Sequence, residues 1–207
     1  MKTLHDFKIF FWDFDGVIIN SDNIRIKGFK NSLEDYNSND VNSLLIFHKN
    51  NGGLSRYVKF RFFFEKILNQ PLNEEKFQKL LLKYSKFCQK NLMNKKLLIS
   101  EVIQYIKENY NNKIFHIASG SDNQELNELC NGMEISSYFK SINGSPEPKK
   151  EIIKRIIKEN NYLKKNICLI GDSINDYQAA AFNKIFFFGY NNLELKKIKN
   201  SNYLNNF

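Results

Sequence analysis

The sequence predicts a Rossmann-like α/β fold, a three-layer core with a central parallel sheet, together with an inserted α-helical cap domain. Two observations predict this fold. Short apolar runs alternate with longer amphipathic segments, which is typical of parallel strands joined by crossover helices. Residues 17–94 break the alternation, because they carry helical patterns without a strand-like run. We therefore expect a core domain of residues 1–16 and 95–207 and a cap domain of residues 17–94.

Five short segments have the composition of buried strands. Each is too short for a helix, and most are rich in Ile and Phe. In chain order they are Ile9–Trp12, Ile114–Ala118, the weaker Ser141–Asn143, Ile167–Ile170 and Ile185–Phe188. Because strands that alternate with helices are joined by parallel crossovers, we expect all five in one parallel sheet.

Helical patterns occupy the segments between these strands. In the core they are Leu97–Tyr110, Asp122–Cys130 and Ile152–Ile157, and in the cap Asp22–Tyr36, Asp40–Phe47, Ser55–Leu68 and Asn73–Lys90. Asp122 and Glu125 have the spacing of a capping box, and Pro148 can open the helix that follows it. The tail Asn191–Phe207 is rich in Asn and Lys, and we expect its end to be frayed.

The formal net charge of +9 raises the possibility of a nucleic-acid partner, which we do not favour. Only four basic residues are arginines, and the lysines are scattered along a chain that is also rich in Asn and Ile, as expected for an AT-rich genome. We expect a solvated lysine surface and no nucleic-acid partner. The positive field would still favour an anionic substrate.

The sequence also bears on location and assembly. No apolar run approaches the ~18 residues of a membrane span, and the N-terminus has no signal-peptide pattern. The three cysteines are widely spaced, which disfavours a disulfide framework or a zinc site. We expect a cytoplasmic protein without membrane association, a monomer or a weak dimer.

Chemically distinctive residues follow the predicted strands where each strand ends. The first strand leads into Asp13 and Asp15, the second into Ser119 and Gly120, and Ile167–Ile170 into Asp172 and Asp176. A segment with two lysines, Lys149 and Lys150, follows the weaker strand. Because ligands bind at the carboxyl ends of strands in an open parallel sheet, we expect these groups to converge on one edge.

These residue types together suit phosphoryl transfer. Four carboxylates would repel one another without a cation, and oxygen ligands alone suit Mg²⁺. Ser119 and nearby backbone N–H groups can hold phosphate oxygens, and a lysine can neutralise the remaining charge. One carboxylate can then attack phosphorus to give an aspartyl-phosphate. A second, two residues away, can protonate the leaving oxygen and later activate water.

The chain resembles the haloacid dehalogenase (HAD) superfamily, in the phosphatase and phosphomutase branch with a helical cap inserted after the first motif. The resemblance covers nearly the whole chain. Asp13-Phe14-Asp15-Gly16-Val17-Ile18 matches the first motif, Ser119 ends the strand of the second, and Gly171-Asp172-Ser173-Ile174-Asn175-Asp176 matches the fourth.

The resemblance implies a role for each carboxylate. Asp13 would be the nucleophile and a Mg²⁺ ligand, and Asp15 the general acid and base that also binds Mg²⁺ through its backbone carbonyl. Asp172 would be a direct Mg²⁺ ligand, and Asp176 would ligate the metal or hold a metal-bound water. Asp15 favours phosphoryl transfer, because true dehalogenases of the superfamily lack an acid at this position.

The third motif departs from the common form. Many members with this cap place a lysine directly before Pro-x-Pro, where this chain has Ser145. The lysine follows instead, at Lys149 or Lys150. We favour Lys149 as the catalytic and phosphate-binding lysine, because it opens a helix at the active edge; the sequence does not exclude Lys150.

Three cap residues are candidates for substrate contact. Two glycines, Gly52 and Gly53, allow a tight turn before a helix that Ser55 can cap. Arg56 then lies in the first turn and can clamp a carboxylate or phosphate. Lys59 lies one turn on and His48 precedes the glycines, and both are weaker candidates.

The predicted function is that of a Mg²⁺-dependent phosphomonoesterase. Its substrate would be a small phosphorylated metabolite, a sugar phosphate or a phosphoglycolate-like acid. One alternative is a β-phosphoglucomutase-like phosphomutase, since Asp15 does not separate the two activities. A second is a non-catalytic binding protein on the same fold, which the four core carboxylates disfavour.

Overall fold

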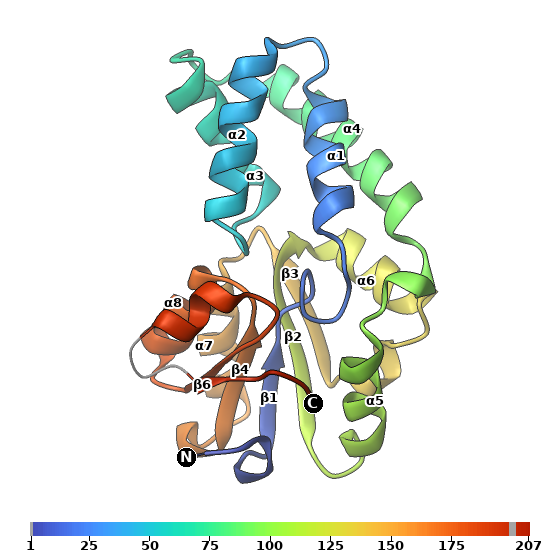
Figure 1. The fold of residues 1–207 in the computed structure, drawn as a ribbon, viewed down its shortest axis with the longest axis vertical. Helices are drawn as coiled ribbons and strands as arrows, with labels where there is room; N and C mark the ends of the chain where they lie inside the picture. Colours follow the sequence, from blue (N-terminus) through green and yellow to red (C-terminus); the bar gives the residue numbers. More distant parts are fainter. Residues whose placement is uncertain (1, 199–201) are drawn as a thin grey trace.

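The computed structural model describes residues 2–198 and 202–207 (Figure 1). Its described residues form one parallel sheet of six strands in the order β3-β2-β1-β4-β5-β6. The strands are β1 (Ile9–Trp12), β2 (Ile114–Asp122), β3 (Ser141–Ser145), β4 (Ile167–Gly171), β5 (Phe186–Gly189) and β6 (Asn202–Tyr203). The parallel sheet predicted from the sequence is confirmed, and the first and fourth strands lie side by side at its centre.

Helices cover both faces of the sheet and make three layers (Figure 1). Helices α5 (Ser100–Asn109) and α6 (Asn123–Gly132) pack on one face, and α7 (Lys149–Glu159) and α8 (Ile174–Asn183) on the other. In β1, Phe10 and Trp12 face the first pair of helices, and Ile9 and Phe11 face the second. Side chains alternate along a strand, so a strand covered on both faces is apolar throughout.

The helical part lies beyond the carboxyl ends of the strands, at the top of Figure 1. It consists of α1 (Asp22–Ser32), α2 (Ser38–Asn50), α3 (Arg56–Phe62), a π-helical turn (Phe63–Ile67) and α4 (Glu74–Leu92). Ile19 pairs with Leu98, so the chain leaves the sheet and returns to it at adjacent points. The limits of 17 and 94 for the cap stay a prediction.

Two expectations for the helical part differ from the structure. The single helix expected over Ser55–Leu68 contains the π-helical turn, which packs Phe63 and Phe64 into the core of the cap. Helix α2 continues past Phe47 to Asn50, so His48 lies in a helix. Residues 48–51 contain neither Gly nor Pro, which explains why the helix continues past Phe47.

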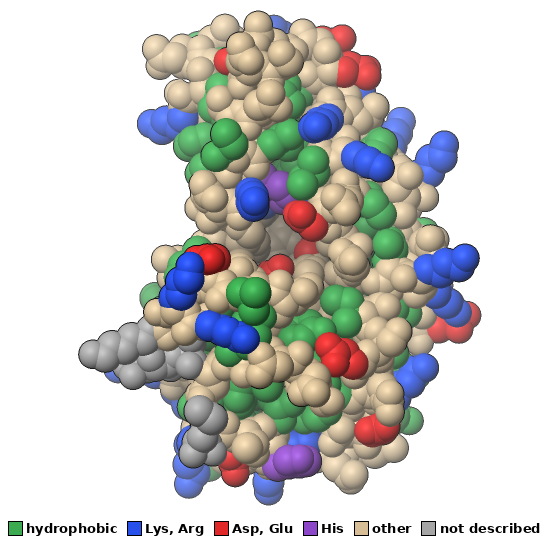
Figure 2. Space-filling view, viewed as in Figure 1, with side chains coloured by type: hydrophobic (Ala, Val, Ile, Leu, Met, Phe, Trp, Pro, Cys, Tyr) green, Lys and Arg blue, Asp and Glu red, His purple; other side chains and the backbone are tan. Residues whose placement is uncertain are grey.

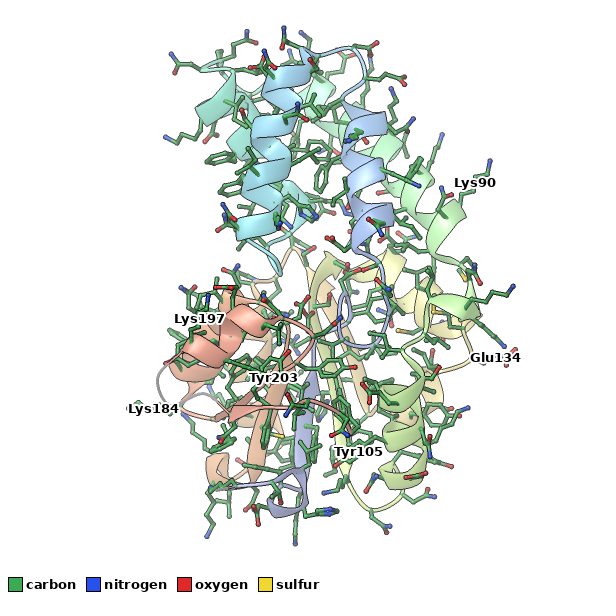
Figure 3. All side chains as sticks on the ribbon, in the orientation of Figure 1. Lys90, Tyr105, Glu134, Lys184, Lys197 and Tyr203 are labelled. Atoms are coloured by element: carbon green, nitrogen blue, oxygen red, sulfur yellow. The ribbon has the colours of Figure 1, made fainter. Side chains whose placement is uncertain are left out.

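The prediction of a frayed C-terminal end was wrong for residues 202–207. Strand β6 pairs with β5, and the ring of Phe207 packs against Trp12, Tyr105 and Tyr190. Figure 3 labels Tyr105 on α5 and Tyr203 on β6. Burial of an aromatic side chain outweighs the polar composition of the tail.

The lysine surface follows the sequence prediction. Lys90, Lys184 and Lys197 are exposed and extend outward from three separate elements (Figure 3). Within the described part of the chain, no helix combines the length and apolarity that crossing a membrane requires.

Candidate active site

Asp13 lies directly after β1, in the centre of the sheet. Its backbone N–H donates to the carbonyl of Ile170 at 2.9 Å, which continues the pairing of β1 with β4. Its side chain is buried, and Oδ1 accepts a hydrogen bond from the backbone N–H of Phe14 at 2.7 Å. The fold therefore fixes a carboxylate at the end of a rigid, buried strand.

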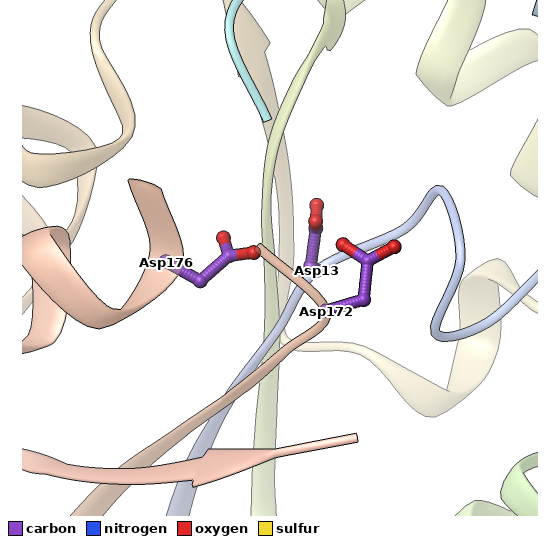
Figure 4. A group of neighbouring side chains, drawn as sticks. All are labelled: Asp13, Asp172 and Asp176. Carbon is purple, nitrogen blue, oxygen red and sulfur yellow. The ribbon is translucent and has the colours of Figure 1, made fainter. Parts of the chain in front are cut away.

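Three carboxylates meet at this point (Figure 4). Asp13 extends from the end of β1, Asp172 from the turn after β4 and Asp176 from the first turn of α8, and one oxygen of each lies within 4.8 Å of the others. Burial and then the charge of Asp176 raise the pKa of Asp13 from 3.8 to about 7. Burial and then Asp13 raise the pKa of Asp172 well above its usual value. Like charges held this close favour a bound cation.

Lys149 is the lysine at this site. Its Nζ lies 2.8 Å from Asp13 Oδ1 and also contacts Asp176 Oδ1. Burial alone would lower the pKa of Lys149, but the carboxylates of Asp13 and Asp176 outweigh it and raise that pKa. Lys150 is exposed and lies over the ring of Phe182. We refer to Asp13, Asp172, Asp176 and Lys149 as the acidic cluster, in which three carboxylates share one ammonium group.

Gly16 is required for this packing. Its φ of +77° is unfavourable for other residues, and an added Cβ would lie 2.0 Å from Asp172 Oδ2. The glycine after Asp15 therefore lets the loop turn back beneath Asp172.

Ser119 and Gly120 lie in β2, the strand beside β1. Strand β2 extends beyond the predicted Ala118 to Asp122, with an irregular register between these two residues. The Ser119 hydroxyl is buried and accepts the backbone N–H of Ser121 at 3.1 Å. The strand end thus has a distorted conformation that the sequence does not reveal.

The cap closes over this edge of the sheet. The carbonyl of Gly52 accepts a hydrogen bond from Asn175 Nδ2 at 2.6 Å. The backbones of Gly53 and Gly120 also lie close together, because a Cβ added to Gly120 would be 2.1 Å from the carbonyl oxygen of Gly53. Between cap and core remains a cavity of about 120 Å³. Figure 2 shows the hollow, with acidic and histidine side chains at its edge. Residues lining it include Asp13, Asp15, Ser119, Gly120, Arg25, His48, Arg56 and Lys59.

Asp15 does not join the acidic cluster through its side chain. It accepts hydrogen bonds from Arg25 Nε at 2.9 Å, from the Ser21 hydroxyl at 2.5 Å and from the Ser121 hydroxyl at 2.5 Å. Burial would raise its pKa, but Arg25, followed by the hydroxyls, lowers the pKa to about 2. The carboxylate is therefore held ionised, and turned toward the cap, in this arrangement.

Glu125 joins Arg25 to Arg56. Its Oε1 lies 2.5 Å from Arg25 Nη1 and 2.7 Å from Arg56 Nη2, and all three side chains are buried. Arg56 also donates to the Ser85 hydroxyl and stacks over Tyr84. We did not predict roles for Arg25 and Glu125. The rarity of arginine in this chain was the available signal for Arg25. The capping-box spacing assigned the Glu125 carboxylate to the start of its own helix, whereas in the structure it contacts Arg25 and Arg56.

Lys59 and His48 lie on the cap side of the cavity. Lys59 Nζ lies 2.8 Å from His48 Nδ1, and both side chains are buried. Burial lowers the pKa of His48 and lowers that of Lys59 to about 8. The residues proposed from the sequence as substrate or phosphate contacts line this cavity, with the exception of Lys149. Lys149 contacts Asp13 instead.

Solved structures of similar fold include enzymes of phosphate chemistry. β-Phosphoglucomutase (PgmB) from Clostridium difficile has a TM-score of 0.77 and 17% identity, over 97% of this chain and 91% of that one. A protein described as a predicted phosphoglycolate phosphatase from Haemophilus somnus has a TM-score of 0.71 and 19% identity, over 99% and 90%. The HAD-hydrolase YfnB from Bacillus subtilis, described as bound to magnesium, has a TM-score of 0.72 and 14% identity, over 97% and 95%.

These identities are low, so the similarities establish the fold, including the inserted cap, and leave the substrate open. No curated protein matches the chain. The family model described as haloacid dehalogenase-like hydrolase matches residues 10–189, which run from the second residue of β1 to the end of β5 and include all the residues of the acidic cluster. The chain therefore belongs to the haloacid dehalogenase-like hydrolase family.

Proposed function

We propose that this hydrolase is a Mg²⁺-dependent phosphomonoesterase that acts on a small phosphorylated metabolite through an aspartyl-phosphate on Asp13. One observation carries the proposal. The buried carboxylate of Asp13 opens onto the cavity, with Lys149 Nζ 2.8 Å from it and Ser119 on the same cavity lining. A nucleophile, a cation and a hydroxyl donor around one small space suit a phosphoryl group.

The acidic cluster fits Mg²⁺. Asp13, Asp172 and Asp176 offer only oxygen atoms, and His and Cys are absent from the group. The raised pKa values of Asp13 and Asp172 reflect repulsion and burial that a divalent cation would offset. These three side chains and the backbone carbonyl of Asp15 would hold the ion. When bound, it would neutralise charge on the phosphoryl group.

The reaction would take two steps. Asp13 attacks phosphorus, the bond from phosphorus to the ester oxygen breaks, and the leaving oxygen receives a proton from Asp15. Water then attacks the phosphoryl group while Asp15 accepts a proton from it, which frees phosphate and restores Asp13. The ion pair with Arg25 favours ionised Asp15 and so suits the second step. The first step requires Asp15 to carry a proton and to turn from Arg25 toward the leaving oxygen; water returns this proton to Asp15 in the second step.

Phosphatase turnover with a generic substrate tests this function. With p-nitrophenyl phosphate and Mg²⁺, Asp13→Asn should lower kcat by at least about 10³-fold, because the amide is a poor nucleophile. Asp35→Asn, which makes the same change at an exposed position, is the matched control. EDTA should abolish turnover and Mg²⁺ restore it. Full activity of Asp13→Asn would remove the nucleophile assignment.

The phosphomutase alternative has its own test. Phosphorus NMR with a hexose 1-phosphate distinguishes release of free phosphate from conversion to the 6-phosphate. Conversion without free phosphate would replace the phosphatase by a mutase. Binding of phosphate esters without turnover of any ester would favour the non-catalytic alternative.

A further inference from the structure

Lys59 is a buried cation without a carboxylate partner. Its residue is 4% exposed, and its Nζ makes one hydrogen-bond contact, to His48 Nδ1. It forms no ion pair with any carboxylate of residues 2–198 and 202–207. A buried ammonium group that no carboxylate contacts is costly, so its position calls for a reason other than stability.

The other two buried cations of the cavity have internal partners. Arg25 is paired with Asp15 and Glu125, and Arg56 lies against Glu125. We refer to Arg25, Arg56, Lys59, Asp15 and Glu125 as the cationic cluster. It contains three cations and two carboxylates, so one positive charge is in excess, and Lys59 is the cation that no carboxylate contacts.

His48 holds the Lys59 ammonium in place. The His48 ring packs against Phe29 at 5.1 Å, and its Nδ1 accepts one Lys59 N–H. His48 Nε2 lies 3.7 Å from the exposed carboxylate of Asp22 and has no hydrogen-bond partner among the described residues. An ammonium group has three N–H donors, so two remain for a ligand.

The cavity limits what that ligand can be. Lys59 and Asp13 line the same space of about 120 Å³, which is smaller than the pockets of roughly 300–1,000 Å³ that hold larger ligands. With a phosphoryl group at Asp13, the space left in this cavity suits a short leaving group. Its far end would meet the excess positive charge at Lys59.

We propose that Lys59, held by His48, is a subsite for a carboxylate on the leaving group, so that the preferred substrates are phosphomonoesters of short hydroxy acids. This inference rests on the proposed phosphatase function and names its substrate class. Arg56, predicted as the anion clamp, instead has Glu125 as its partner, and its role toward substrate stays a prediction.

Matched pairs of esters test the subsite. 2-Phosphoglycolate has a carboxylate where 2-hydroxyethyl phosphate has a hydroxymethyl group. 3-Phosphoglycerate and glycerol 3-phosphate differ in the same way. In at least one pair, kcat/KM for the acid should exceed that for the neutral ester by at least about tenfold, as expected for a charge-assisted contact. Lys59→Met should reduce this ratio to about one. Because each ratio is taken within one protein sample, partial misfolding of a variant cancels.

Lys66→Met is the control, because it removes an exposed cap lysine and should leave the ratio as in the wild type. Equal turnover of acid and neutral esters in both pairs would overturn the subsite. An equal loss of kcat/KM for the acid and the neutral ester in Lys59→Met would also overturn it, since Lys59 would then contact the phosphoryl group that both esters share.

Binding separates this inference from the proposed function. If no ester, including p-nitrophenyl phosphate, is turned over, the phosphatase proposal fails, and calorimetric titration of the same esters still tests the subsite. The wild type should then bind the acid of one pair at least about tenfold more tightly than the neutral ester, and Lys59→Met should lose this preference. Equal affinities would contradict the subsite independently of catalysis.

Discussion

The acidic cluster and the cationic cluster both contribute residues to one cavity, and they differ in the sign of their excess charge. In the acidic cluster, three carboxylates share Lys149, and burial, followed by the charge of Asp176, raises the pKa of Asp13 to about 7. In the cationic cluster, two carboxylates face three cations, and the excess remains on Lys59. Each imbalance suits a different part of a ligand: a metal ion and phosphoryl group on one side, a carboxylate on the other.

The cationic cluster should also bind the cap to the core. Glu125→Gln leaves Arg25 and Arg56 without this carboxylate, and we expect the free energy of unfolding to fall by about 3–5 kcal/mol, as for a buried ion pair that loses one partner. Urea unfolding measures it. Glu128→Gln, on the same helix, should change stability by no more than about 0.5 kcal/mol. Equal effects would mean that the cluster is energetically unimportant.

The acidic cluster depends on its one ammonium group. Lys149→Met should lower kcat/KM for p-nitrophenyl phosphate by about 10²–10³-fold, because the charge near the transferred group is lost. Lys150→Met should have little effect, since Lys150 lies over Phe182. The reverse pattern would show that the lysine was assigned incorrectly.

Bound Mg²⁺ should reverse the sign of the effect of Asp172→Asn on stability. Without Mg²⁺, Asp172→Asn should stabilise the fold, because it removes one of three repelling carboxylates. With saturating Mg²⁺, the wild type should gain about 2–3 kcal/mol and Asp172→Asn much less. Thermal unfolding with and without Mg²⁺ measures both effects. An equal Mg²⁺ gain in the two proteins would separate Asp172 from the metal site.

Lys59 should leave a signature in the pH dependence of stability. Its pKa is about 8 in the folded protein and 10.5 when unperturbed, so the folded state binds fewer protons between these values. Stability of the wild type should therefore rise relative to Lys59→Met as pH increases from about 8 to 10.5, by about 1–3 kcal/mol. Burial is the largest influence on this pKa; the carboxylates of Asp15, Asp13 and Asp172 oppose it, and Arg25 adds to it. A constant difference across this range would indicate that Lys59 has a counter-charge.

The acidic cluster was largely predictable from the sequence. Its residues follow strands, and parallel strands end at one edge, so the apolar run before Asp13 and the run before Asp172 bring the two carboxylates together. Lys149 could be favoured over Lys150 only by its place at the start of a helix. In the structure Lys149 contacts Asp13 and Lys150 lies over Phe182, and the catalytic role of Lys149 stays a prediction.

The cationic cluster could not be predicted in the same way. Arg25 and Glu125 are 100 residues apart and lie on helices, whose orientation depends on how the cap packs against the core. The sequence indicated Arg56 as an anion clamp and could not reveal that Glu125 faces it. Strand β6 was missed for a related reason, since its two residues carry no apolar run and are ordered by pairing with β5.

Chemical trapping of the intermediate tests the central claim most directly. Protein quenched during turnover of a phosphate ester with Mg²⁺ is treated with borohydride, which reduces an aspartyl-phosphate to homoserine, and its peptides are mapped by mass spectrometry. The account predicts this conversion at Asp13 alone, and its absence without substrate. Conversion at another carboxylate, or steady turnover with Asp13 unmodified at every quench time, would contradict it.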